Sequence, residues 1–286
     1  MLRFFPEDFR GEVGERPLKP GIVFAVVIAC CLLISSCGSG SSSPVPQGSL
    51  ANGNWYITAS SAVVPANSLT MDASLGQDSS GIAVDLHIDN STCFDFANDL
   101  VTLTGVFTGT GGSLVLTSAP VRSQVITVTA DGSGSSFTGS YSITGGCAGG
   151  DHGAITATFV PPVSGTWIAS FASGSTTTTI TATLLQASVA DINGRFPLTG
   201  TLAFSGSPCS TGGTVIYPSA LGDVSSVSGN SVSVVATTND IGGGSGSLAF
   251  TGTLPNPSTA TYATGGYVVL SGLCGGESFN VQFNKQ

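Results

Sequence analysis

The sequence predicts an all-β protein made of two tandem copies of an antiparallel meander, each closed by one disulfide. Three observations predict this fold. Apolar residues alternate with Ser and Thr at strand-like intervals, Gly, Asn and Asp separate these runs, and the chain repeats itself. No window shows the sustained 3.6-residue period of an amphipathic helix. Barrels and sandwiches share the two-residue period, so the sequence leaves both architectures open.

The N-terminal segment carries basic residues, then an apolar run, then small residues before a cysteine. The apolar run, 21–34, spans about 14 residues and is too short to cross a ~30 Å hydrocarbon core as a helix. With Ser35, Ser36 and Cys37 it resembles the signal peptide and lipobox of bacterial lipoproteins. That resemblance implies cleavage before Cys37, a lipid on its sulfur, and a place in the cell envelope. The same resemblance to lipoproteins implies that Gly38, in place of Asp after the lipidated cysteine, favours the outer membrane over the inner one.

Composition divides the rest of the chain into a tether and two domains. We expect a signal peptide over 1–36, a lipidated cysteine with a flexible Gly/Ser/Pro tether over 37–50, and β-domains over 51–161 and 162–286. Two adjacent prolines mark the boundary between the domains, because proline stiffens the chain and cannot donate a ladder hydrogen bond.

An internal repeat relates the two domains and selects a disulfide pairing. Gly-x-Trp at residues 53–55 recurs at 165–167, and each copy then carries two cysteines at equivalent places. In an oxidising compartment this predicts the pairs Cys93–Cys147 and Cys209–Cys274. The four cysteines lack the close CxxC spacing of a zinc site.

In the first copy, strand-like runs recur about every ten to twelve residues, as expected for a meander. The expected strands lie near 54–60, 68–74, 81–88, 99–107, 112–118, 124–130, 136–143 and 153–160. A Gly-x-Trp that opens an eight-strand meander resembles the calycin group, which includes lipocalins and avidins. The resemblance implies that Trp55 and Trp167 close one end of a barrel whose other end takes a small ligand. From the residues alone, both tryptophans are interpreted as core aromatics.

One strand of the first copy presents a polar trio. Alternation in 82–89 places Asp85, His87 and Asp89 on the face opposite the apolar residues. A histidine flanked by carboxylates suits a divalent cation or an acid–base role. The second copy has Thr, Ala and Ser at 201, 203 and 205, so the fold does not require the trio. We therefore interpret it as a solvated strand face, with a weak cation site as the alternative.

Two further polar clusters lie in turns of the first copy. Asp151 and His152 follow Cys147 in a glycine-rich turn, which is interpreted as surface, with a ligand site as the alternative. Acidic and amide residues cluster between Asp89 and Asp99. Oxygen-rich loops suit Ca²⁺, but the spacing matches no calcium-loop pattern, so a hydrated loop is expected.

The charge of the chain and its motifs limit the functions that it can have. Residues 37–286 hold three basic and twelve acidic side chains, so the basic footprint of a nucleic-acid binder is missing. No motif of a known hydrolase, phosphate loop or dinucleotide site is present, and no cofactor is implied.

The sequence therefore predicts a lipid-anchored envelope protein with a non-catalytic interaction or structural role, toward a protein or glycan partner. A carrier that uses a barrel mouth and an extracytoplasmic hydrolase with a site in the first domain are the alternatives.

Overall fold

The computed structural model describes residues 49–63, 68–108, 112–173, 175–217 and 224–286, and these fold entirely as strands and turns. The expected signal peptide, Cys37 and the tether up to residue 48 lie outside the described residues. Both barrels belong to one compact unit, Pro46–Gln286. Among the described residues there is no helix of the length and hydropathy needed to span a membrane.

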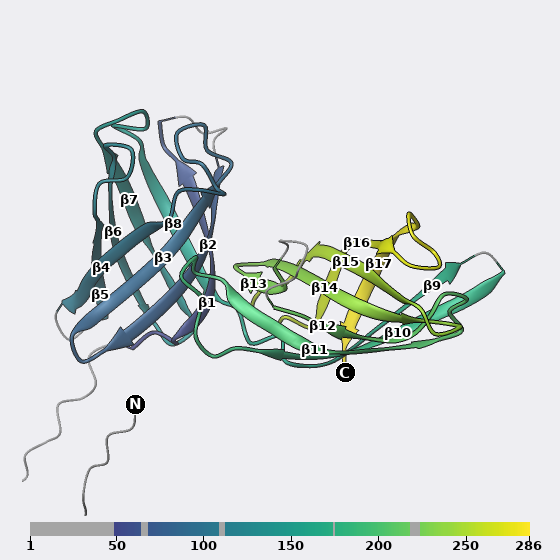
Figure 1. Cartoon of the computed structure of the whole chain (residues 1–286). Helices are drawn as coiled ribbons and strands as arrows, with labels where there is room; N and C mark the ends of the chain where they lie inside the picture. Colours follow the sequence, from purple (N-terminus) through teal and green to yellow (C-terminus); the bar gives the residue numbers. More distant parts are fainter. Residues whose placement is uncertain (1–48, 64–67, 109–111, 174, 218–223) are drawn as a thin grey trace, which may run out of the picture. The chain divides into compact units, whose positions relative to one another are not determined.

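The first copy is a closed eight-strand barrel (Figure 1), in which each strand pairs antiparallel with the next and β8 returns to β1. Its strands are β1 Gly53–Ser61, β2 Ser68–Asp78, β3 Gly81–Asp89, β4 Val101–Thr108, β5 Ser113–Ser118, β6 Val125–Ser133, β7 Ser136–Thr144 and β8 His152–Phe159. Every strand expected from the sequence is present. The largest difference is in β2, which extends to Asp78 rather than ending near residue 74.

The second copy is also a ring of eight strands, with one short strand added. Its strands are β9 Gly165–Ser173, β10 Thr176–Gln186, β11 Phe196–Ser205, β12 Ser210–Val215, β13 Ser226–Ser228, β14 Ser231–Asp240, β15 Ser245–Thr253, β16 Tyr262–Ser271 and β17 Ser278–Lys285. The β17–β9 and β10–β11 pairings close the ring. The three-residue β13 pairs with both β11 and β14.

The choice between sandwich and barrel is thus resolved in favour of the barrel, which agrees with the eight-strand meander that the calycin resemblance implied. Alternation fills each barrel with apolar side chains. In β3, Ile82, Val84, Leu86 and Ile88 point inward and are at most 3% exposed. The two barrels have separate cores.

Both expected disulfides are confirmed, one in each barrel. The Cα atoms are 5.5 Å apart in Cys93–Cys147 and 5.8 Å apart in Cys209–Cys274, within the usual range for a disulfide. The bonds close loops of 54 and 65 residues. In the chain-entropy account, each restricts the unfolded chain by about 4 kcal/mol.

Each tryptophan makes the same contact in its barrel. The Trp55 indole Nε1 donates to the carbonyl of Ala51 (2.8 Å), and Trp167 Nε1 donates to the carbonyl of Val163 (2.7 Å). In both cases the acceptor lies four residues earlier in the chain, and the ring is buried. The contact gives the polar indole N–H a partner while the ring fills the core.

Candidate functional site

A row of polar side chains crosses the outer face of the first barrel. Strand register places Tyr56 on β1 opposite Asp72 on β2, and Asp72 opposite His87 on β3. Their chain neighbours Ile57, Met71 and Leu86 point into the core, so the row faces outward. Yet Asp72 is only 6% exposed and His87 only 5%. These outward residues are buried because segments of the second barrel cover them.

Asn54 fixes one of the covering segments by two hydrogen bonds. Its side-chain Nδ2 donates to the carbonyl of Gly229 (2.8 Å), and its Oδ1 accepts from the Gly229 N–H (2.7 Å). Gly229 lies in the turn between β13 and β14, and its φ of 51° is left-handed. A Cβ on Gly229 would collide with the carboxylate of Asp72, so only glycine fits here.

Asp72 lies beneath this turn and is the most perturbed carboxyl group of the contact. Burial and, to a smaller extent, the nearby charge of Asp89 raise its pKa from 3.8 to about 7. Hydrogen bonds from the Ser231 side chain and the Asn230 N–H, and the charge of Arg195, act in the opposite direction. A substantial fraction of Asp72 is therefore neutral at pH 7.

His87 is held by a loop of the second barrel. Its Nε2 lies 2.8 Å from the carbonyl oxygen of Asn193. A carbonyl only accepts, so Nε2 carries the proton and donates. Its Nδ1 is buried and has no partner among the described residues. The loop itself is organised by Asp191, whose Oδ1 accepts from the N–H groups of Asn193 and Arg195 and whose Oδ2 accepts from Tyr217.

A pocket of about 300 Å³, lined by both polar and apolar residues, lies beside Asp72 and His87. Its wall combines Arg195, the rim aromatic Phe96 and hydroxyl groups from strands of the second barrel. The hydroxyl-bearing and small apolar lining residues are Val224, Ser226, Ser228, Ser231, Val232, Ser233 and Thr251. Among the described residues, no carboxylate lies within ion-pairing distance of the Arg195 guanidinium. We call this the Arg195 pocket.

This arrangement places the three residues of the predicted trio on β3 in different environments. Its interpretation as a solvated face is wrong for His87, because the second barrel covers that residue. Asp85 accepts a hydrogen bond from Thr102 (2.6 Å), and Asp89 is exposed and accepts from the Asn90 N–H (2.7 Å). The three side chains do not converge on one point suited to a metal ion in the described part of the chain. Such a point is formed instead by Cys209, Cys274 and Glu277, but both sulfurs are in the disulfide.

Asp151 and His152 have separate environments. Asp151 accepts hydrogen bonds from the Ser61 hydroxyl (2.5 Å) and the Tyr141 hydroxyl (3.0 Å). Burial and this acceptor together raise the pKa of Tyr141 to about 12. His152 is exposed, and its Nδ1 lies 3.1 Å from the carbonyl of Gly150. Over the described residues, no hydrogen bond or ion pair links this turn to Asp85, His87 or Asp89.

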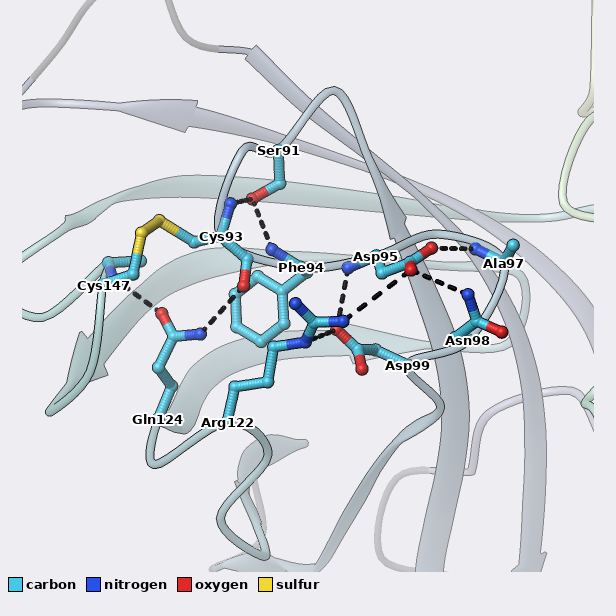
Figure 2. A network of polar contacts seen from close by, with 11 residues as sticks. Ser91, Cys93, Phe94, Asp95, Ala97, Asn98, Asp99, Arg122, Gln124 and Cys147 are labelled. Carbon is cyan, nitrogen blue, oxygen red and sulfur yellow. Dashed lines mark hydrogen bonds and ion pairs between the residues drawn. A yellow bond between two sulfur atoms is a disulfide. The ribbon is translucent and has the colours of Figure 1, made fainter.

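The oxygen-rich loop after Asp89 is occupied by an arginine of the same barrel (Figure 2). Arg122 forms ion pairs with Asp99 and, at 3.7 Å, with Asp95. Asp99 also accepts from the Asp95 N–H, and Asp95 accepts from the Asn98 amide. The guanidinium and the backbone N–H groups therefore satisfy the carboxylates that a calcium ion would need.

The same end of the barrel is joined to its disulfide by a buried glutamine. Gln124 donates from Nε2 to the carbonyl of Cys93 (3.2 Å) and accepts at Oε1 from the Ala148 N–H (2.7 Å). Gln124 thus bridges the two chain segments that Cys93–Cys147 connects (Figure 2). We assign this network to the stability of the loop.

The barrel interiors leave little space for a ligand. The residual cavity measures about 10 Å³ in the first barrel and about 30 Å³ in the second, and both are lined by the apolar cores. These volumes correspond to one or two water molecules, whereas small-molecule sites occupy roughly 300 Å³ or more. The Arg195 pocket, outside both barrels, reaches that size.

Four residues of this contact carry no motif in the sequence: Asn54, Asp72, Arg195 and Gly229. Two signals were nevertheless present. Asp72 is an acidic residue within the apolar segment 69–75, and Arg195 is one of only three basic residues after residue 36. Such scarce charges in a neutral, strand-rich sequence mark positions where charge has a specific partner or use.

Comparisons with known proteins give no family assignment. No protein-family description matches the chain, and no curated protein matches it. One solved structure, "The Structure of Intact Ap-TbpB (N and C lobes)", aligns at 14% identity over 76% of this chain and 54% of that one, with a TM-score of 0.20. The chain thus spans about half the length of that structure. The architecture described above rests on the strand pairings, not on this alignment.

Proposed function

We propose that this chain is an exported lipoprotein of the bacterial cell envelope, anchored through Cys37, that acts by binding rather than by catalysis. Residues 1–36 are the signal peptide in this proposal, and 37–50 are the lipidated tether of the two barrels. The two closed disulfides support it, because such bonds persist in oxidising compartments outside the cytoplasm. Gly38 after the cysteine favours the outer membrane.

The observation that carries a binding role is the contrast between filled barrels and an open pocket. The interiors hold cavities of 10 and 30 Å³, while the Arg195 pocket holds 300 Å³. A barrel-mouth carrier needs the opposite arrangement. The acid–base candidates Asp85 and Asp151 are engaged in hydrogen bonds with Thr102, Ser61 and Tyr141. These contacts favour a structural part for both carboxylates over a hydrolase site.

The anchoring is tested with the full chain and its Cys37→Ser variant, expressed in a bacterial host and fed an alkyne-labelled fatty acid. We expect the unmodified chain to incorporate the label and to sediment with membranes. The variant should do neither. Mass spectrometry of the mature N-terminal peptide should begin at Cys37 with an acyl mass added. A native N-terminus upstream of Cys37, or label retained in the variant, contradicts the proposal.

A further inference from the structure

We propose that the Arg195 pocket binds a small hydroxylated carboxylate, of which a uronic acid is the simplest case. The inference extends the proposed binding role by naming a ligand class. It places the site on the contact between the barrels, not in a barrel mouth.

The first step is the state of the arginine. Only three basic residues follow residue 36, and two have partners: Arg122 binds Asp95 and Asp99, and Lys285 donates to the carbonyl of Pro162 (2.8 Å). Arg195 has no such partner among the described residues, although it lines a pocket in a chain with an excess of carboxylates. A guanidinium with free donors is suited to a bidentate carboxylate.

The second step is the state of the two carboxyl groups whose charge acts on Arg195, Asp72 and Asp191. Asp191 accepts hydrogen bonds from the N–H groups of Asn193 and Arg195 and from Tyr217, and among the described residues it forms no ion pair with the Arg195 guanidinium. Asp72 shares the pocket wall, but it already accepts hydrogen bonds from the Ser231 side chain and the Asn230 N–H. It does not approach Arg195 closely enough to form an ion pair. The guanidinium of Arg195 therefore lies near carboxyl groups that do not neutralise its charge. This leaves the guanidinium for an external anion.

The third step is the rest of the wall. Ser226, Ser228 and Ser233 bring hydroxyl groups that both donate and accept, which suits the hydroxyls of a sugar. Phe96, 40% exposed at the rim, offers an apolar ring whose centroid lies 5.7 Å from that of His87. A flat ring beside hydroxyl groups suits the alternating C–H and O–H surface of a pyranose.

The fourth step is the charge of the ligand. A phosphate dianion usually requires several cationic or backbone N–H donors, and the pocket has one guanidinium and no lysine in its wall. The chain also carries a net charge of −9, which opposes a dianion more strongly than a monoanion. A single carboxylate on a hydroxylated ligand matches both the one cation and the hydroxyl-rich wall.

The test is calorimetry on the full chain in detergent with three probes: D-glucuronate, D-glucose and acetate. We expect saturable binding of D-glucuronate that is tighter than that of either of the others, since each lacks one half of the recognised chemistry. Arg195→Gln should weaken D-glucuronate binding roughly ten- to a hundred-fold, the effect of losing a hydrogen-bonded charge. It should leave D-glucose unchanged. Arg195→Lys keeps the charge without the planar fork and should fall between.

Lys285→Gln is the control, because it removes one positive charge at the end of β17, a strand that does not line the pocket. It should leave D-glucuronate binding unchanged. The proposal is overturned by the absence of saturable D-glucuronate binding, by equal binding of acetate, or by an equal loss in the Lys285 variant. Fatty-acid labelling at Cys37 is read independently. If the chain is not labelled but binds D-glucuronate, the lipid anchoring is refuted and the binding site stands. If the chain is labelled but does not bind D-glucuronate, only the binding site is refuted.

Discussion

At the residue scale, the contact between the barrels depends on a carboxyl group that is buried without a counter-ion in contact. Burial makes the charged form of Asp72 costly, and Asp89 adds to that cost. The Ser231 and Asn230 hydrogen bonds recover part of it. The protonation state of Asp72 therefore affects the free energy of unfolding.

Replacement of Asp72 by Asn should flatten the dependence of stability on pH. The folded-state pKa of about 7 lies above the ordinary 3.8, so the folded state binds this proton more tightly than the unfolded chain does. The contribution is fully present below about pH 4 and is lost as the pH rises through about 7. Its complete loss amounts to roughly 4 kcal/mol. Asn keeps an acceptor oxygen and takes no charge. Urea unfolding of both proteins from pH 4 to pH 8 measures the difference.

Asp78→Asn serves as the control for this experiment, because Asp78 is an exposed carboxyl at the end of the same strand. Hydrogen bonds from Ser80 lower its pKa, so it should not titrate in this window. If the stability of the Asp72 variant falls with rising pH as steeply as that of the unmodified protein, another group is responsible.

At the element scale, the β13–β14 turn is the part of the second barrel that enters the contact. It presents the backbone of Gly229 to Asn54, a contact that joins residues 175 positions apart in the chain. β13 is only three residues long and pairs with β11 and β14, which hold the turn in place. This short strand also contributes the fully buried Val227 to the core of the second barrel, which anchors the turn.

Asn54→Ala should destabilise the protein by roughly 2–4 kcal/mol. The change leaves the N–H and C=O of Gly229 buried without their partners, and each such group costs about 1–3 kcal/mol. Asn52→Ala is a matched control: Asn52 makes the same two bonds to the backbone of Gln77, but in an exposed position. Water replaces its bonds, so the control should cost about 1 kcal/mol or less. Equal losses in the two variants would show that the buried contact contributes nothing of its own.

The sequence predicted the strands well and the contact poorly, for one physical reason. Alternation indicates which side chains face the inside of a barrel. In β3 it correctly placed the alternate apolar residues from Ile82 to Ile88 inside. It says nothing about whether a second domain later covers the outside. His87 and Asn193 are 106 residues apart, and no local pattern joins them. The repeat predicted both disulfides because it compares equivalent positions directly. β13 was not predicted, since three residues are too few to show a period.

At the scale of the whole molecule, two separate cores are joined by a mostly polar contact. Each core has its own disulfide and its own tryptophan. Tyr56 of the first barrel also packs against the core of the second. Such a contact couples the folding of two bodies that each have a complete interior.

The two tryptophans offer a test of that coupling. Trp55→Phe leaves Trp167 as the reporter of the second barrel, and Trp167→Phe leaves Trp55 as the reporter of the first. Urea unfolding of each variant is followed both by tryptophan fluorescence, which reports one barrel, and by far-ultraviolet circular dichroism, which reports both. We expect the two methods to give the same midpoint for a given variant. Adding Asn54→Ala should separate the two midpoints, because the barrels then unfold independently. Separate midpoints with Asn54 intact would mean that the contact does not couple the barrels.

The Asn54–Gly229 contact also limits how far the architecture can extend. The contact joins unlike surfaces of two related barrels. When identical units join through unlike surfaces and the rotation does not close a ring, the contact repeats and builds an open filament. Here propagation stops after one step. Where the first barrel has Asn54, the second has Thr166, which carries a shorter hydroxyl side chain in place of the amide. Asn54 and Gly229 therefore satisfy each other within one chain, and neither is left to join a second copy.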